Sequence, residues 1–169
     1  MKTAALTLTL IAACGLAHAD DFPRRKSGLW EMTMTDEEKG ASEPKKSRLC
    51  IDRAFEDLMI KKGMDVTMSK CEKRDVKASG NTITVKSVCN FGRSKLTSTG
   101  VWTYKGDTAY QMVSDGNFNP PMMGISKTHS VQNGKWVGAC PTDMKPGDMV
   151  ITMPDGQEMR TSMPKAGKG

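Results

Sequence analysis

Methionine is the residue type whose chemistry stands out in this chain, with 14 methionines among 169 residues. A thioether sulfur is a soft ligand that suits Cu(I), and it works in an oxidising compartment because it has no proton to lose. Met149, Met153 and Met159 lie near the C-terminal end and are the candidate copper ligands. Their spacings of four and six residues do not form a tight repeated triplet. Filling of an aromatic-poor core is therefore the favoured interpretation, and copper or oxidant handling is the alternative.

The residue types used in catalysis are sparse. His129 is the only histidine after residue 19, and Ser126 and Ser130 beside it lack the strand-to-helix setting of a catalytic serine. Adjacent acids such as Glu37 and Glu38 lie in charged stretches, which is typical of a solvated surface. No glycine-rich phosphate loop precedes a helix. We therefore expect a protein that is not an enzyme, with no catalytic residues, no cofactor and no dedicated metal site.

The first 19 residues have the order of a secretory signal peptide. Lys2 precedes an uncharged run from Ala4 to Leu16, and Ala17-His18-Ala19 supplies the small residues at which such signals are cut. The run is about 13 residues long, whereas a membrane-spanning helix needs about 20, so no transmembrane span is expected. We predict cleavage near Ala19 and a periplasmic or secreted protein. A lipoprotein acylated at Cys14 is the less favoured alternative, because the region ahead of that cysteine is short.

Four cysteines remain once the signal is removed, and we expect them to form two disulfides. In an oxidising compartment an even number of cysteines favours disulfides, with three possible connectivities. The spacings of 21, 18 and 51 residues contain no C-x-x-C pair, which weighs against a redox motif and against a zinc site. The four residues are Cys50, Cys71, Cys89 and Cys140.

A hairpin register favours one connectivity. If residues 79–81 form a three-residue turn, Cys71 falls opposite Cys89 on the neighbouring strand, within reach of a cross-strand disulfide. The same register places Asp75 beside Val85, a mismatch that a β-bulge could relieve. We favour Cys71 with Cys89 and, by elimination, Cys50 with Cys140. The second bond closes a loop of about 90 residues, which the chain-entropy model values at more than about 4 kcal/mol.

The chain after the signal fits one domain, which we assign to residues 20–153. Trp30, Met32 and Met34 alternate with polar residues, a pattern that predicts a strand with one buried face. Asp52 can cap a short helix that ends near Gly63.

Turn signals divide the rest of the chain into short strands. Asn133-Gly134 is the strongest hairpin signal, and Ser114–Gly124, with two prolines, is expected to be a loop. The predicted fold is mainly β: a curved antiparallel sheet or partial barrel with one short helix and two disulfides. Residues 154–169 are rich in Pro, Gly and Lys and are expected to form a disordered tail.

Aromatic residues on the predicted strands suggest a second possible site. In a curved sheet they could line a groove for a small apolar ligand instead of only filling the core. The 25 basic and 19 acidic residues are spread along the chain, and we expect no nucleic-acid partner. The leading hypothesis is a non-catalytic envelope protein that binds a ligand or an envelope protein partner, or has a structural role. The aromatic set is Trp30, Trp102, Tyr104, Tyr110 and Trp136.

Several short motifs occur along the chain in a recognisable order. They are Gly28-Leu29-Trp30-Glu31, Cys50-Ile51, Cys71, Ser79-Gly80-Asn81-Thr82, Cys89, Gly100 to Tyr110, Lys135-Trp136 and Cys140. In that order the chain resembles the domain of unknown function 3617, an uncharacterised family of exported bacterial proteins, over about residues 26–150. The resemblance implies a secreted or periplasmic disulfide-bonded domain and carries over no activity, cofactor or catalytic residue. The insertion after the first strand is shorter here than in the family.

Overall fold

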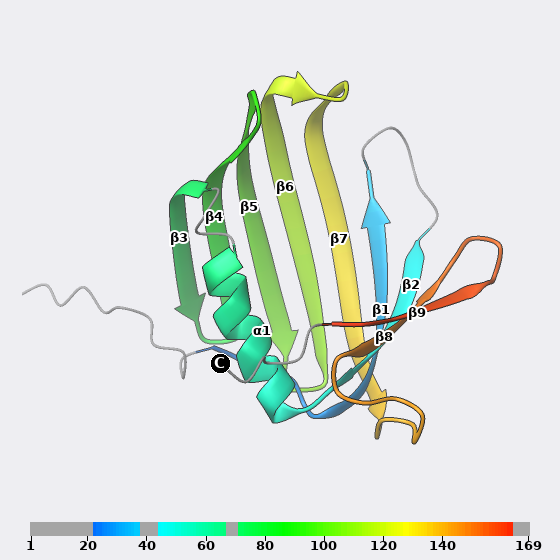
Figure 1. The fold of residues 1–169 in the computed structure, drawn as a ribbon. Coiled ribbons are helices and arrows are strands. Elements are labelled where there is room, and N and C mark those ends of the chain that lie inside the picture. The colour runs from blue at the N-terminus through cyan, green and yellow to red at the C-terminus, as the bar shows by residue number, and fades with distance from the viewer. Residues whose placement is uncertain (1–21, 38–43, 67–70, 164–169) are drawn as a thin grey trace, which may run out of the picture.

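The computed structural model describes residues 22–37, 44–66 and 71–163. In these ranges nine strands form one antiparallel sheet in the order β3-β4-β5-β6-β7-β1-β2-β8-β9, and the sheet does not close (Figure 1). The predicted signal peptide, residues 1–19, and its cleavage site lie outside the described residues. The elements are β1 (Gly28–Asp36), β2 (Lys45–Ile51), α1 (Arg53–Val66), β3 (Cys71–Ser79), β4 (Thr82–Phe91), β5 (Ser94–Lys105), β6 (Ala109–Met122), β7 (Ile125–Gly138), β8 (Asp148–Thr152) and β9 (Glu158–Ser162).

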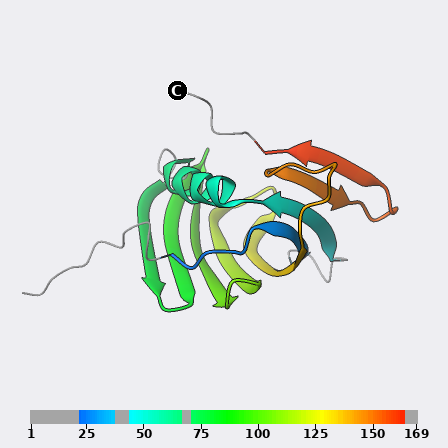
Figure 2. The same ribbon diagram turned by 90° about the horizontal axis from the view of Figure 1, so that it is seen from below.

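The sheet is curved, and α1 lies on its concave side (Figure 2). Side chains alternate between the two faces, so Trp30 and Met32 are buried on the concave face while Glu31 between them is exposed. The main core combines these residues with Leu49 of β2 and Tyr110 of β6. The predicted fold class, a mainly β fold with a curved antiparallel sheet, one helix and two disulfides, is confirmed for the described part of the chain.

The helix begins where the sequence predicts it. The backbone N–H of Phe55 donates to Oδ1 of Asp52 at 2.7 Å, which is a helix N-cap. The expected end at Gly63 is too early, because α1 continues to Val66. Phe55 is buried, and Met59 is partly buried against the main core, so this side of α1 faces the sheet. No helix in the described ranges is long and apolar enough to cross a membrane.

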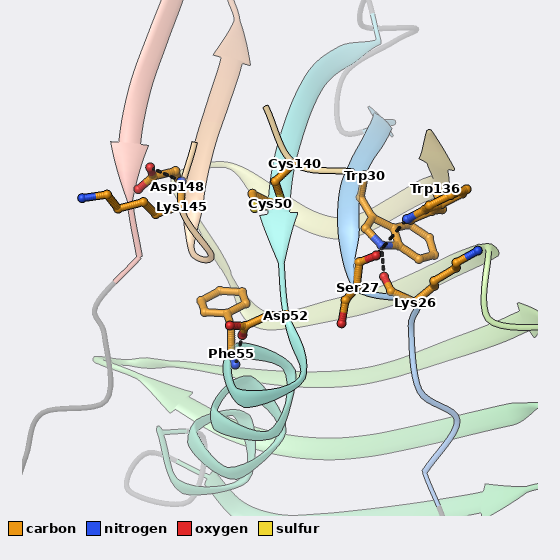
Figure 3. The surroundings of a disulfide bond; sticks show 10 residues. All are labelled: Lys26, Ser27, Trp30, Cys50, Asp52, Phe55, Trp136, Cys140, Lys145 and Asp148. Carbon is orange, nitrogen blue, oxygen red and sulfur yellow. Dashed lines mark hydrogen bonds between the residues drawn. A yellow bond between two sulfur atoms is a disulfide. The ribbon is translucent and has the colours of Figure 1, made fainter. Parts of the chain in front are cut away.

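An N-terminal arm, residues 22–27, links the sheet to α1. The indole N–H of Trp30 donates to the Lys26 carbonyl at 2.9 Å, and that of Trp136 donates to the Ser27 carbonyl at 3.1 Å (Figure 3). On the other side of the arm, Arg24 and Arg25 form ion pairs with two acids of α1. The arm is therefore bonded to both layers.

Strands β6 and β7 are longer than the sequence predicts. The predicted loop at Ser114–Gly124 is wrong, because β6 runs to Met122 and the reversal is at Met123 and Gly124. The predicted turn at Asn133-Gly134 is also wrong, since both residues lie inside β7. Gly134 has a different role there: a Cβ at this position would overlap the Tyr110 ring, so the glycine admits an aromatic side chain.

Both disulfides have the pairing that the register argument favours. Cys71 of β3 bonds Cys89 of β4, and the two residues are register partners. Cys50, two residues before the helix cap, bonds Cys140 beyond the end of β7. The segment that contains α1 therefore has a disulfide at each end, Cys50 before the helix and Cys71 after it.

The β3–β4 hairpin reaches its cysteine register by a route that differs from the prediction. Ser79 pairs with Thr82, so the turn contains two residues and not three. A register shift between Cys71 and Lys73 then brings the two cysteines opposite each other. The expected mismatch at Asp75 disappears, because Val76 is the residue that lies opposite Val85.

The C-terminal end is more ordered than predicted. Residues 158–162, expected within a disordered tail, form β9 and pair with β8, while residues 164–169 lie outside the described ranges. On the convex side, Val150 of β8 packs with Met144 and the Cys50–Cys140 disulfide in a small second core. The Lys145 N–H donates to the Asp148 carboxylate at 2.8 Å in the turn that leads into β8 (Figure 3).

Candidate binding chambers on the concave face

A cavity of about 330 Å³ lies between α1 and the concave face of β3 to β7, and we call it the aromatic chamber. Met59 and Ile60 of α1 cover it, and Phe22 and Pro23 of the N-terminal arm close one side. Its floor comes from four neighbouring strands and is apolar or aromatic: Val76, Ile83, Val85, Trp102, Tyr104 and Tyr110.

An ion pair lies at one end of the aromatic chamber. Arg25 Nη2 donates to Glu56 Oε2 at 2.6 Å and Nε donates to Oε1 at 3.0 Å, with the two side chains only 15% and 5% exposed. The guanidinium also lies 5.7 Å from the ring centroids of both Trp30 and Tyr110. Burial lowers the pKa of Arg25, but the hydrogen bond and charge of Glu56 outweigh it, so the pKa is raised overall. This pair fixes the arm to α1.

A second arginine lines the aromatic chamber from the other side. Arg74 lies on β3, the edge strand of the sheet, and burial lowers the pKa of its guanidinium. An arginine remains protonated at physiological pH even with such a shift. Arg74 therefore contributes a guanidinium to the lining of the aromatic chamber, and the guanidinium of Arg25 is bonded to Glu56.

The two tyrosines of the floor are held in their neutral form. Burial raises the pKa of Tyr104 to about 12, and burial likewise raises the pKa of Tyr110. The Tyr110 hydroxyl donates to Oε1 of Gln132 at 3.3 Å. Both rings therefore act as neutral, largely apolar surface near pH 7.

A second cavity of about 360 Å³ lies beside the first, and we call it the methionine chamber. It is bounded by β1, β2, β8, α1 and the residue that follows β9. Arg25, Met59, Tyr110 and Gln132 line both chambers and form the shared wall. Five methionines line it: Met32, Met34, Met59, Met149 and Met163.

The predicted copper ligands do not gather in one place as a set of three. The strand register puts Met149, Met153 and Met159 on the same face of β8 and β9, because Ile151 pairs with Met159. Met149 lines the methionine chamber, whereas Met153 and Met159 are 42% and 50% exposed. Met149 instead lines the methionine chamber with four methionines that are not among the predicted copper ligands: Met32, Met34, Met59 and Met163.

The predicted aromatic set divides into two roles. Trp102, Tyr104 and Tyr110 line the aromatic chamber, as the groove hypothesis requires. Trp30 is fully buried beneath Arg25, and Trp136 packs under the Lys26 ammonium at 3.9 Å from the ring centroid. These two tryptophans hold the N-terminal arm and do not line the aromatic chamber.

His129 lies on the convex face, away from both chambers. Its Nδ1 is 2.7 Å from Asp115 Oδ1, both side chains are exposed, and the hydrogen bond raises the pKa of the histidine. Ser130 follows it on β7 and so points to the opposite face of the sheet. Among the described residues no group of three or more His, Cys, Asp or Glu side chains could hold a metal ion.

Comparison with known proteins places the chain in a family. No curated protein matches it. One family matches from Arg25 in the N-terminal arm to the disulfide residue Cys140. This span includes α1 and seven of the nine strands that the structure describes. The chain belongs to the family described as "Protein of unknown function (DUF3617)", which matches residues 25–140.

Proposed function

We propose that this protein is an exported, non-catalytic binding protein whose aromatic chamber holds a small apolar molecule with an anionic end. The observation that carries the proposal is the composition of the chamber: apolar and aromatic side chains on the floor and under α1, with Arg74 at one side. Ligand sites are typically cavities of about 300–1,000 Å³ with apolar walls and few polar groups. At about 330 Å³ the aromatic chamber fits a compact ligand.

The anionic end of the ligand is proposed from the hydrogen-bonding chemistry of the Arg74 guanidinium. Glu56 is bonded through both oxygens to Arg25, so its charge is already matched. Arg74 adds a guanidinium to a partly desolvated wall, where a carboxylate, sulfonate or phosphate group forms a strong charge-assisted hydrogen bond.

Binding without catalysis is supported by the protonation states in the aromatic chamber. General acid–base catalysis favours a group whose pKa lies near the working pH. Of the described lining residues, the two tyrosines have raised pKa values and Glu56 is held in an ion pair. We therefore propose that the ligand leaves this chamber chemically unchanged.

Export is part of the proposal and bears directly on the chamber. Cleavage after Ala19 would place Phe22 and Arg25 within the first few residues of the mature chain. Phe22, which lines the aromatic chamber, would then be the third residue of the mature chain. Intact mass of protein from a bacterial envelope fraction tests this: we expect a chain that starts at Asp20, and an acylated Cys14 would overturn it.

The binding test uses two fluorescent probes that differ by one charge. Anilinonaphthalene sulfonate carries a sulfonate, and phenylnaphthylamine has the same rings without it. Val85→Trp should fill the aromatic chamber and abolish binding of both probes, whereas Thr84→Trp, on the opposite face of the same strand, should bind as wild type. Equal binding by the wild type and Val85→Trp would contradict the proposed site.

The charge of the ligand is tested with Arg74→Gln. Loss of one hydrogen bond to a charged group removes about 1.5–3 kcal/mol, so affinity for the sulfonate probe should fall about tenfold or more. Affinity for phenylnaphthylamine should stay within about twofold, because this probe has no sulfonate to bind Arg74 and each tenfold change in affinity needs 1.4 kcal/mol. The matched control is Lys73→Gln, an exposed neighbour on the other face of β3. If Arg74→Gln lowered the affinity for both probes equally, an anionic end of the ligand would be contradicted.

Oxidant handling is a second candidate for the methionines at the surface. Met123, Met153 and Met159 are 90%, 42% and 50% exposed, which leaves their sulfurs accessible to peroxide. Peptide mapping after brief peroxide treatment should find sulfoxide at these positions before it appears at the buried Met32. Faster oxidation of Met32 would contradict a role for the exposed set.

A further inference from the structure

We propose that the methionine chamber is a Cu(I) site, with Met32, Met34 and Met59 as its ligands. The inference is independent of the ligand proposed for the aromatic chamber. Its basis is that five thioethers from β1, α1, β8 and the residue after β9 line one cavity of about 360 Å³. These residues are far apart in the sequence, so the fold itself brings them together.

Thioether chemistry selects the ion. Soft sulfur ligands favour Cu(I) over hard cations such as Mg²⁺ and Ca²⁺, which prefer oxygen. A methionine gives up no proton on binding, and the four cysteines beyond the N-terminal segment are paired in disulfides, so the thioethers are the available sulfur ligands. Binding transfers no electron: Cu(I) arrives and leaves in the same oxidation state, exchanging one set of ligands for another.

The three proposed ligands come from two layers of the fold, the sheet and α1. Met32 and Met34 are two residues apart on β1, so both point to the concave face with about 6.7 Å between their Cα atoms. Met59 approaches from α1 and belongs to the shared wall. The sulfur of Met32 already faces this wall, since it lies 4.0 Å from Nε2 of Gln132. A flexible, unbranched side chain can then turn its sulfur toward a common point.

The surrounding charges are compatible with a monovalent cation. Arg25 is neutralised by Glu56, and Lys45 is paired with Asp36 at 2.7 Å, so two of the basic residues in the lining carry matched acids. Lys46 is the third basic residue of the lining; it follows Lys45 on β2, where successive side chains alternate between the two faces of the sheet.

The chamber also differs from a methionine-filled core. A core at native density leaves few voids larger than a water molecule. Met32 belongs to the main core and Met59, Met149 and Met163 pack against it, but all four also line an open volume, and Met34, Met149 and Met163 are only partly buried. The ion therefore has both space and access.

The test is an anaerobic titration of the mature, disulfide-intact protein with Cu(I) against a chromogenic Cu(I) chelator. We expect the wild type to withdraw one equivalent from the chelator. Loss of an outer-shell partner alone weakens metal sites by about 10–100-fold, so the double variant Met32→Leu, Met34→Leu should lose more than about 100-fold in affinity. The matched control, Met153→Leu with Met159→Leu, should bind as wild type.

Leucine is the chosen replacement because methionine-to-leucine exchange conserves volume and is usually tolerated. Should the double variant fail to fold, Met59→Leu on α1 tests the same site from the other layer. X-ray absorption of the loaded protein should show sulfur scatterers and no nitrogen. Failure to compete with the chelator, loss of binding in the Met153/Met159 control, or a nitrogen scatterer from His129 would each overturn the proposal.

Discussion

The aromatic chamber and the methionine chamber lie side by side on one concave face and share Arg25, Met59, Tyr110 and Gln132, but their walls differ in stiffness. Valine, isoleucine and aromatic rings have few rotamers and give the first chamber a defined shape. Unbranched thioethers give the second an adaptable one with soft sulfur ligands. One curved sheet and one helix therefore form two cavities, and the side chains of each group of strands decide what each cavity can bind.

The two chambers also differ in how their strands are held. The Cys71–Cys89 disulfide joins β3 to β4 at the edge beside the aromatic chamber. The Cys50–Cys140 disulfide joins β2, a strand of the methionine chamber, to the segment that covers its convex side. Their sequence separations are 18 and 90 residues.

Removing each disulfide in turn should have the largest effect on this comparison. The chain-entropy model values a loop of 90 residues at about 4.6 kcal/mol and a loop of 18 at about 3.2 kcal/mol. Cys50→Ser with Cys140→Ser should therefore lower the free energy of unfolding more than Cys71→Ser with Cys89→Ser. Urea denaturation measures both. The reverse order would mean that the fold depends more on the disulfide at the edge strand β3 than on the disulfide at β2.

Breaking the shared wall should disturb both chambers together. Arg25→Ala leaves the Glu56 carboxylate, 5% exposed, without its ion-pair partner and should lower the free energy of unfolding by about 3 kcal/mol. Arg24→Ala is the matched control: its partner Asp57 is 50% exposed, so the loss should be below about 1 kcal/mol. The double variant Arg25→Met, Glu56→Leu should recover most of the stability. Equal losses of unfolding free energy in Arg24→Ala and Arg25→Ala would show that the Arg25–Glu56 ion pair is not buried.

High pH should act on the aromatic chamber first, because Tyr104 lines only that chamber, Tyr110 lies in the shared wall and thioethers do not titrate. The pKa of Tyr104 is about 12 when folded and about 10 when unfolded, so the unfolded chain loses its proton first as the pH rises. Stability should thus be intact below pH 10 and fall by about 2 kcal/mol between pH 10 and 12. Tyr104→Phe should make this fall shallower in denaturation curves. If the pH dependence of stability were the same in Tyr104→Phe as in the wild type, the hydroxyl of Tyr104 would be exposed to solvent.

Loosening α1 should have the smallest effect on stability. Asp52→Ala removes the N-cap hydrogen bond to Phe55 and should lower the free energy of unfolding by about 1 kcal/mol. Because α1 covers the aromatic chamber, amide exchange should rise in α1 while β6 and β7 stay protected. Asp52→Asn retains a capping oxygen and should behave as wild type. Faster exchange throughout the sheet would mean that the helix supports the whole fold.

Local patterns were sufficient to predict the parts of the fold that depend on near neighbours. Alternation around Trp30 and Met32, the Asp52 cap and the Cys71–Cys89 pairing depend on residues close in sequence, and all three are present. The β-bulge after Cys71 shows the limit: the pairing was predicted through an incorrect turn, because a bulge compensates for a two-residue turn and leaves no pattern of its own.

Long-range contacts account for what could not be predicted. Asn133-Gly134 has the composition of a hairpin turn, yet Gly134 lies in a continuous strand because Tyr110 of the neighbouring strand needs the space. Likewise, the methionine chamber joins residues from Met32 to Met163, and no local spacing reveals that they meet. The alternation of Met32 and Met34 predicts that these two share one face. The positions of the other three depend on tertiary contacts, which the sequence pattern does not show.

Methyl NMR of protein labelled at the methionine methyl groups tests whether the two chambers bind different ligands. Anilinonaphthalene sulfonate should shift the Met59 signal in the shared wall and leave Met149 and Met163 unmoved. Cu(I) should then shift Met32, Met34 and Met59 while Met153 and Met159 stay in place. Separate binding in the two chambers would be contradicted if the sulfonate shifted the signals of Met149 and Met163 as strongly as that of Met59, or if Cu(I) shifted the signals of the exposed Met153 and Met159 first.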